Sequence, residues 1–127
     1  MGPAFRRKWL VIGWVLVGLI VGGSLMPGLP SSDVQHVDKI QHVCAYFLLM
    51  NWFAQAMRLR RASIAVAVFA MGVAVELLQG MTGWRTYDMY DMAANTTGVL
   101  LGWLAAPPRG PDLYARVAAA YASRGMP

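Results

Sequence analysis

Charged residues are scarce in this chain of 127 residues: they make up 13% of it, while hydrophobic residues make up 57%. Soluble domains are about a quarter charged and about half apolar. A soluble domain this short could not bury so much apolar surface, so we expect a lipid bilayer to be the solvent. The single cysteine, Cys44, excludes an internal disulfide and, because it lies in an apolar run, is expected to be buried.

The net charge of +5 does not predict a nucleic acid partner, because no basic patch extends beyond short segments. Four apolar runs instead predict an all-α polytopic membrane protein with four transmembrane helices, at residues 9–26, 38–57, 62–80 and 88–106 of a single domain spanning 1–127. No A-x-A-like cleavage site precedes Pro27, so we expect the first helix to be retained.

The distribution of basic residues predicts the topology. Of the eleven basic residues, only Lys39 and Arg85 lie at the end where the second and fourth helices begin. Because basic segments stay in the cytoplasm, both termini are expected inside. The tail, 107–127, carries Leu113, Val117 and Tyr121 at helical spacing; it is either an amphipathic helix on the membrane surface or a solvated tail.

Polar and small residues form one stripe along the fourth predicted helix. Their steps of three and four are the period of one helical face, and the residues are Asp88, Asp91, Asn95, Gly98 and Gly102. A polar face that leads into a Gly-x-x-x-Gly pair indicates a membrane helix packed closely on its neighbours. A second such pair, Gly18 and Gly22, predicts a weaker packing face on the first helix.

Polar residues of the other segments arrive at the same end of the predicted bundle. The second helix begins with Asp38, Lys39, His42 and Tyr46, the third ends with Glu76 and Gln79, and Arg85 follows in a loop. A carboxylate in hydrocarbon is costly unless it is paired, so we expect these side chains to turn inward and meet. The alternative is that they only hold the helices together.

These motifs resemble the VanZ-like family of small bacterial membrane proteins. The resemblance covers residues 38–104 and rests on five elements: Asp38-Lys39-x-x-His42-x-x-x-Tyr46, Glu76-x-x-Gln79, Arg85, Asp91-x-x-x-Asn95-x-x-Gly98, and Gly102. It implies a multi-pass protein of the bacterial inner membrane. It also implies a link to teicoplanin resistance, which is associated with the member that gives the family its name.

Two classes of function fit this pattern. In the first, an enzyme acts on a lipid-linked cell-envelope substrate, with His42, Glu76, Asp38 and Asp91 as catalytic residues, because imidazole serves as acid or base near neutrality. Substrate contacts are then expected from Lys39, Tyr46, Gln79, Arg85, Asp88 and Asn95.

In the second class, a protein binds a lipid head group or a partner helix without catalysis. A transporter is disfavoured because the inner halves of the helices carry almost no ionisable residue. No metal motif is present, and the sequence implies no particular cofactor or oligomeric state; membrane lipids are the expected surroundings.

Overall fold

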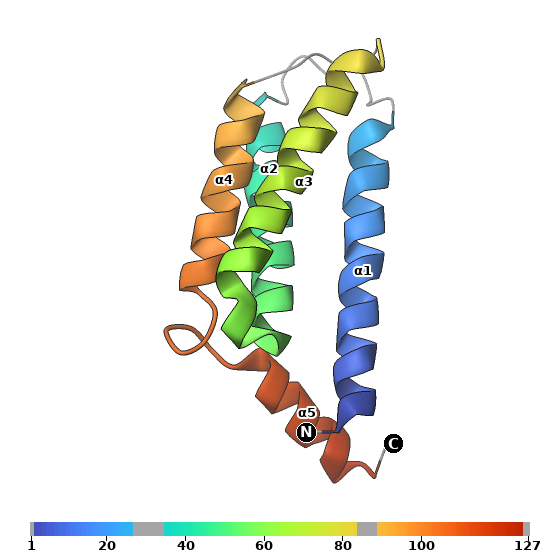
Figure 1. The fold of residues 1–127 in the computed structure, drawn as a ribbon, viewed down its shortest axis with the longest axis vertical. Helices are drawn as coiled ribbons and strands as arrows, with labels where there is room; N and C mark the ends of the chain where they lie inside the picture. Colours follow the sequence, from blue (N-terminus) through green and yellow to red (C-terminus); the bar gives the residue numbers. More distant parts are fainter. Residues whose placement is uncertain (1, 27–34, 84–88, 126–127) are drawn as a thin grey trace.

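The computed structural model describes residues 2–26, 35–83 and 89–125, and for residues 35–38 only the backbone. All regular structure in this part of the chain is helical, which confirms the predicted class. The elements are α1 (Pro3–Leu25), α2 (Gln35–Ala56), the 3-10 turn η1 (Arg58–Arg60), α3 (Arg61–Met81), α4 (Met89–Leu104) and α5 (Leu113–Ser123). In Figure 1, α1 to α4 run alternately up and down, so that each is antiparallel to the next, and α5 crosses the end of the bundle where α1 begins.

Each predicted apolar segment corresponds to one helix. The helix α1 begins six residues earlier than expected, at Pro3, because proline suits the first helical position, where its missing N–H is not needed. The helix α4 ends at Leu104, ahead of Pro107 and Pro108. Within the described residues, Pro3–Leu25 and Arg58–Met81 are long and apolar enough to cross a membrane. Membrane crossing by α2 and α4 stays a prediction.

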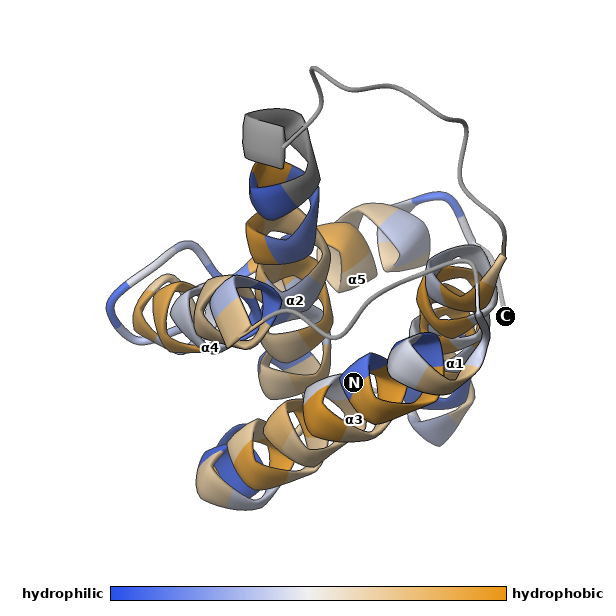
Figure 2. Ribbon diagram, turned by 90° about the horizontal axis from the view of Figure 1, so that it is seen from above, coloured by the Kyte–Doolittle hydropathy of each residue, from blue (hydrophilic) through white to orange (hydrophobic). Residues whose placement is uncertain are grey.

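The helix α2 is the centre of the bundle. Its side chains Tyr46, Leu49 and Met50 are almost completely buried, and they form one core with residues of α3 and α4 such as Val68 and Val99. Seen from above in Figure 2, α1, α3 and α4 surround α2, and α1 and α3 are coloured mostly hydrophobic.

Two glycines bring α4 against the backbone of α2. A Cβ atom at Gly98 would lie 2.5 Å from the carbonyl oxygen of Val43, and one at Gly102 would lie 2.7 Å from that of Phe47. Real Cβ atoms do not approach other atoms so closely, so only glycine fits at these positions. The predicted Gly-x-x-x-Gly packing face of this helix is therefore confirmed.

The predicted packing face of α1 is wrong within this chain. Among the described residues, no atom outside the adjoining turns of α1 itself lies within 4 Å of a Cβ built on Gly18 or Gly22, whereas one built on Gly13 would lie 2.8 Å from the ring of Phe53. The helix α1 therefore meets α2 through its first half.

Two tryptophans hold that first half of α1 in place. The rings of Trp9 and Trp52 stack with centroids 4.0 Å apart. Each indole N–H donates to the backbone carbonyl of the other residue, at 2.9 Å from Trp9 and 2.8 Å from Trp52. Because both indole donors are satisfied inside the bundle, this pair can be buried without an unpaired polar group.

The expectation that Cys44 is buried is wrong: its side chain is exposed. The neighbouring residues His42 and Tyr46 face the other helices, and in a helix the residue midway between them points to the opposite side. An apolar run does not show which side of α2 is buried, because its exposed side also carries apolar residues such as Ile40 and Leu48.

The tail folds back on the bundle, so the expectation of a solvated tail is wrong for residues 113–123. The ring of Tyr114 lies 5.2 Å from that of Phe5 and 5.3 Å from that of Trp9, centroid to centroid. Of the predicted amphipathic line, Leu113 and Val117 are exposed, whereas the ring of Tyr121 lies 5.4 Å from that of Phe5, centroid to centroid. Contact of Leu113 and Val117 with a membrane surface stays a prediction.

A polar network that the sequence analysis missed joins α2, α4 and the start of α5. The Asn51 amide donates to the Gly102 carbonyl at 3.1 Å. The Gln55 amide donates to Asn51 Oδ1 and to the Pro111 carbonyl, both at 3.1 Å, and its oxygen accepts from the Tyr114 N–H at 3.2 Å. The spacing of Asn51 and Gln55, one helical turn apart, is the signal that could have indicated this network.

We expect replacement of Gly98 by alanine to destabilise the bundle by about 1–3 kcal/mol, the usual cost of overpacking a tight contact. Gly18→Ala is the matched control, because its Cβ enters open space and alanine favours a helix. The melting temperature in detergent should fall for Gly98→Ala and stay level or rise for Gly18→Ala. Equal shifts in the two variants would contradict the close α2–α4 contact.

Asp112 makes the docking of α5 dependent on pH. Its carboxylate accepts a hydrogen bond from Arg58 and caps α5 by accepting from the Ala115 N–H at 3.0 Å. The Arg58 hydrogen bond, aided by the Ala115 N–H, lowers the pKa of Asp112 below its ordinary value of 3.8. A carboxylate with a lowered pKa stabilises the fold above its unfolded-state pKa, and this contribution is lost as pH falls through the lowered folded-state value.

We therefore expect wild-type protein to melt at a higher temperature than Asp112→Asn at pH 7. Asparagine keeps the helix cap but cannot pair with the Arg58 charge. The difference in melting temperature should shrink as pH is lowered through and below the ordinary range of aspartate. A difference that is the same at pH 7 and pH 3 would show that the charge of Asp112 plays no part.

Candidate functional site at the start of α2 and α4

Four polar side chains from α2 and α4 meet at the end of the bundle where both helices begin. Lys39 Nζ forms an ion pair and hydrogen bond with Asp91 Oδ1. His42 Nδ1 lies 2.9 Å from Asn95 Oδ1, and His42 Nε2 lies 3.7 Å from Asp91 Oδ2. His42, Asp91 and Asn95 are buried, and the Lys39 side chain is 24% exposed.

Helical spacing explains why these residues meet. Lys39 and His42 are three residues apart, and Asp91 and Asn95 are four apart, so each pair shares one face of its helix. Gly98, the next small residue on the same face of α4, sets that face directly against α2. We refer to Lys39, His42, Asp91 and Asn95 as the polar cluster.

The hydrogen bond to Asn95 determines which nitrogen of His42 carries a proton. The Asn95 Oδ1 atom is an acceptor, so His42 Nδ1 donates to it. Nε2 of the same ring faces Asp91 Oδ2. The imidazole thus has a polar partner on each side, which fixes the orientation of its ring.

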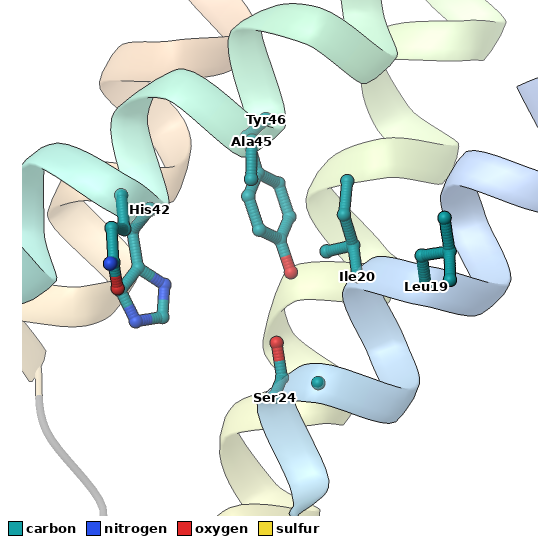
Figure 3. A pocket seen from close by; sticks show the side chains of 8 residues that line it. Leu19, Ile20, Ser24, His42, Ala45 and Tyr46 are labelled. Atoms are coloured by element: carbon teal, nitrogen blue, oxygen red, sulfur yellow. The ribbon is translucent and has the colours of Figure 1, made fainter. Parts of the chain in front are cut away.

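A cavity of about 280 Å³ opens beside His42, between α1 and α2. Its polar lining comes from Ser24, Gln41, His42 and Tyr46, and its apolar lining includes Ile20. Figure 3 shows the Tyr46 hydroxyl directed toward the Ser24 end of α1, with His42 beside it. Tyr46 is 1% exposed, yet no group of the described residues hydrogen-bonds its hydroxyl. A buried hydroxyl at a cavity wall is suited to bind a polar ligand group.

The helix α3 contributes two further buried residues of the predicted site. Glu76 is completely buried, and Gln79 is 1% exposed. The Gln79 amide donates to the Ser24 carbonyl at 2.7 Å and so joins α3 to the last turn of α1. Gln79 thus acts as a link between helices, and a contact of Gln79 with substrate stays a prediction.

Three of the predicted site residues cannot be placed. Arg85 and Asp88 lie outside the described residues, and so does the side chain of Asp38, although its backbone begins α2. The predicted orientation of His42 by Asp38 is therefore untested. The described residues that position the imidazole are Asn95 and Asp91.

Gly72 is a site residue that the sequence analysis missed. A Cβ atom at this position would lie 3.0 Å from the Tyr46 ring and 3.1 Å from the Asn95 amide nitrogen. The missing side chain lets α3 approach both residues. Its position one helical turn before Glu76, on the face that bears the polar residues of α3, is the signal that could have identified it.

The described residues hold no group of three or more His, Cys, Asp or Glu side chains that could bind a metal ion. The fold and the site together define a small helical protein, compatible with a membrane, that buries a histidine-centred polar cluster near one end of the bundle. The chain belongs to the VanZ/LLP1 family, because the profile of that family matches residues 6–109. The resemblance inferred from the motifs is thereby confirmed.

One curated relative is the uncharacterized protein C11E3.10 of Schizosaccharomyces pombe. It is 31% identical to this chain over 106 residues, which are 80% of this chain and 64% of that protein. The chain thus spans 64% of the length of the relative it matches. No solved structure matches the chain. Because this relative comes from a yeast, family membership does not by itself specify a bacterial membrane.

We expect the Lys39–Asp91 pair to be coupled in stability. Lys39→Gln or Asp91→Asn alone leaves one buried or half-buried charge without this partner, whereas the double variant removes both charges. The double variant should therefore be more stable than the sum of the single losses predicts, with a coupling of roughly 0.5–3 kcal/mol.

Chemical denaturation in detergent measures this coupling. The cycle Lys8→Gln with Asp91→Asn is the control, because Lys8 lies at the other end of the bundle and bonds to Tyr121. That cycle should be additive. An additive result for Lys39 with Asp91 would show that the pair is not formed in the folded protein.

Proposed function

We propose that the chain is a multi-pass membrane protein in which α1, α2, α3 and α4 all cross the bilayer. The support is the apolar surface that all four helices leave exposed. Large hydrophobic residues more than 40% exposed include Val11, Trp14 and Leu19 on α1, Ile40 and Leu48 on α2, Val66 and Phe69 on α3, and Leu100 and Leu101 on α4. The hydrocarbon of a bilayer can surround such an apolar surface without the unfavourable free energy that contact with water carries.

The proposed orientation puts the polar cluster on the outer side of the membrane. The end of the bundle opposite to the cluster carries exposed basic residues of α1, η1 and α5, among them Arg6, Arg58 and Arg116. Basic segments are retained in the cytoplasm. Both termini are then cytoplasmic, and the membrane is the bacterial inner membrane that the motifs imply.

The position of Asp91 on α4 supports a site at the level of the lipid head groups. Asp91 lies in the first turn of α4 as described, at the end of the bundle where Lys39 and His42 open α2. In a helix that crosses the bilayer, an end turn lies near the boundary between hydrocarbon and head groups, where phosphate and sugar groups of lipids are found.

We infer that the site binds the polar head of a lipid-linked cell-envelope molecule and that His42 exchanges a proton with it. One observation carries this inference: a buried imidazole, held by Asn95 at one nitrogen and faced by Asp91 at the other, lines an open cavity. In this proposal Lys39 holds Asp91 in place, and Asp91 and Asn95 are positioning residues. Tyr46 donates a hydrogen bond to the head group.

A non-catalytic role is the second candidate, and a specific observation favours it. Both the Lys39–Asp91 pair and the His42–Asn95 hydrogen bond join α2 to α4. Bonds of this kind hold membrane helices together, where the hydrophobic effect does not. In this case the cluster is structural, or it captures a head group without turnover.

The two candidates differ in what His42→Gln does. For the proposed function, we expect the variant to fold with nearly unchanged melting temperature, because glutamine can still donate to Asn95, but to lose activity. The activity measured is teicoplanin tolerance in a sensitive bacterial host that expresses the protein, the phenotype implied by the family resemblance. Glu76→Gln tests the predicted acid of α3 in the same way.

Cys44→Ser is the matched control, two residues from His42 on the exposed side of the same helix. It should leave stability and tolerance unchanged. If His42→Gln loses stability and tolerance together, the cluster is structural. If the variant keeps both, His42 has no role in the site.

A further inference from the structure

A second, apolar cavity of about 510 Å³ lies deeper in the bundle, between α1, α2 and α3. We call it the apolar groove. Its lining has no charged side chain, and the residues are Leu10, Trp14, Val17, Leu49, Phe53, Met57, Ile64, Ala67, Val68 and Met71. A cavity lined in this way does not hold ordered water, because it offers water no hydrogen-bond partners.

The apolar groove continues the cavity beside His42. On α1, Val17 lines the groove and Ile20, one turn further on, lines the polar cavity. On α2, Leu49 lines the groove and Tyr46, one turn earlier, lines the polar cavity. Residues three apart are neighbours on a helix face, so the two cavities follow the same pair of helix faces.

The second half of α1 leaves this path open to the surroundings. In its apolar stretch, α1 is only 11% buried, and Leu19 at the polar cavity is 67% exposed. Trp14, which lines the groove, is also 67% exposed. A ligand can therefore reach both cavities sideways, from within a bilayer, rather than through the water-facing end.

The dimensions select a single hydrocarbon chain rather than a helix of another protein. From Leu10 to Gly23, the two cavities extend along thirteen residues of α1, which rise by about 20 Å. A helix of that length and about 10 Å across would fill roughly 1,500 Å³. The two cavities together offer about half of that volume, which is too little for a helix but sufficient for a narrow chain.

We propose that the apolar groove holds the single hydrocarbon chain of a lipid phosphate whose head group lies at His42 and Tyr46. This inference rests on the proposed function, because it takes the polar cluster as the head-group site. The chain lies against α1, α2 and α3 while the phosphate meets the hydroxyl of Tyr46 and the imidazole of His42. The protein then selects its ligand by two features: an anionic head group, and a single long hydrocarbon chain instead of two.

The test uses the full chain in phosphatidylcholine vesicles with hexadecyl phosphate that carries a diazirine at the far end of its chain. After illumination, mass spectrometry locates the labelled residues. We expect labelling on the groove lining of α1, residues 10–17, and α3, residues 64–71, and we expect unlabelled hexadecyl phosphate to compete for it. Labelling that spreads over the lipid-facing surface without competition would overturn the proposal.

Ala67→Phe fills the groove. Ala67 is exposed within the lining, so the added ring enters open space and not the packed core. We expect a several-fold loss of groove labelling at an unchanged melting temperature. Ala70→Phe is the matched control, because Ala70 is exposed on the same helix and lines neither cavity. Equal groove labelling of both variants and wild type would overturn the proposal. The positions labelled in the wild-type protein test the proposal without any substitution.

Two further measurements separate this inference from the proposed function. If His42→Gln and Lys39→Gln leave the competed groove labelling intact, and hexadecanol competes as well as hexadecyl phosphate, the groove holds a chain but the cluster is not its head-group site. If those variants release the probe while Ala67→Phe retains it at wild-type level, the head-group site stands and the groove inference fails.

Discussion

The close contact between α4 and α2 is the constraint on which the rest of the structure depends. Gly98 and Gly102 remove the side chains that would otherwise meet the carbonyl oxygens of α2. Only at this separation can the short side chains of Asp91 and Asn95 reach Lys39 and His42. The same face of α4 therefore packs against α2 through its glycines and supplies Asp91 and Asn95 to the polar cluster. Substitution of either glycine is thus expected to disturb the polar cluster as well.

The two ends of α1 differ in a way that matters for function. Its first half is fixed to α2 by the Trp9–Trp52 stack and by the aromatic contacts that Phe5 and Trp9 make with Tyr114 of α5. In its second half, a Cβ built on Gly18 or Gly22 would meet no atom of the described residues outside α1 within 4 Å. The first half therefore holds α1 on the bundle, while the cavity lined by His42 and Tyr46 opens beside the second half.

Most of the fold and about half of the site follow from the sequence. Apolar runs and prolines predict the four long helices, and helical spacing predicts that Lys39, His42, Asp91 and Asn95 share a site. Spacing does not show which helix faces which neighbour: for this reason the packing of Gly18 was predicted wrongly, and Cys44 was expected to be buried. The spacing of Gly72 from Glu76 indicates which face of α3 it occupies, but not that Tyr46 and Asn95 lie against it, because that depends on how α3 crosses them. The hydrogen bond from Gln79 to the Ser24 carbonyl of α1 likewise depends on how α3 lies in the bundle, which helical spacing does not show.

The charge balance of the polar cluster explains how so many polar groups can be buried together. Lys39 and Asp91 offset one another, so the cluster avoids the cost of an isolated buried charge. His42 is the member of the cluster that also lines the cavity, and its two ring nitrogens face Asn95 and Asp91. In the proposed function, a head group that enters the cavity therefore meets an imidazole that is already in position, so binding requires no rearrangement of the cluster.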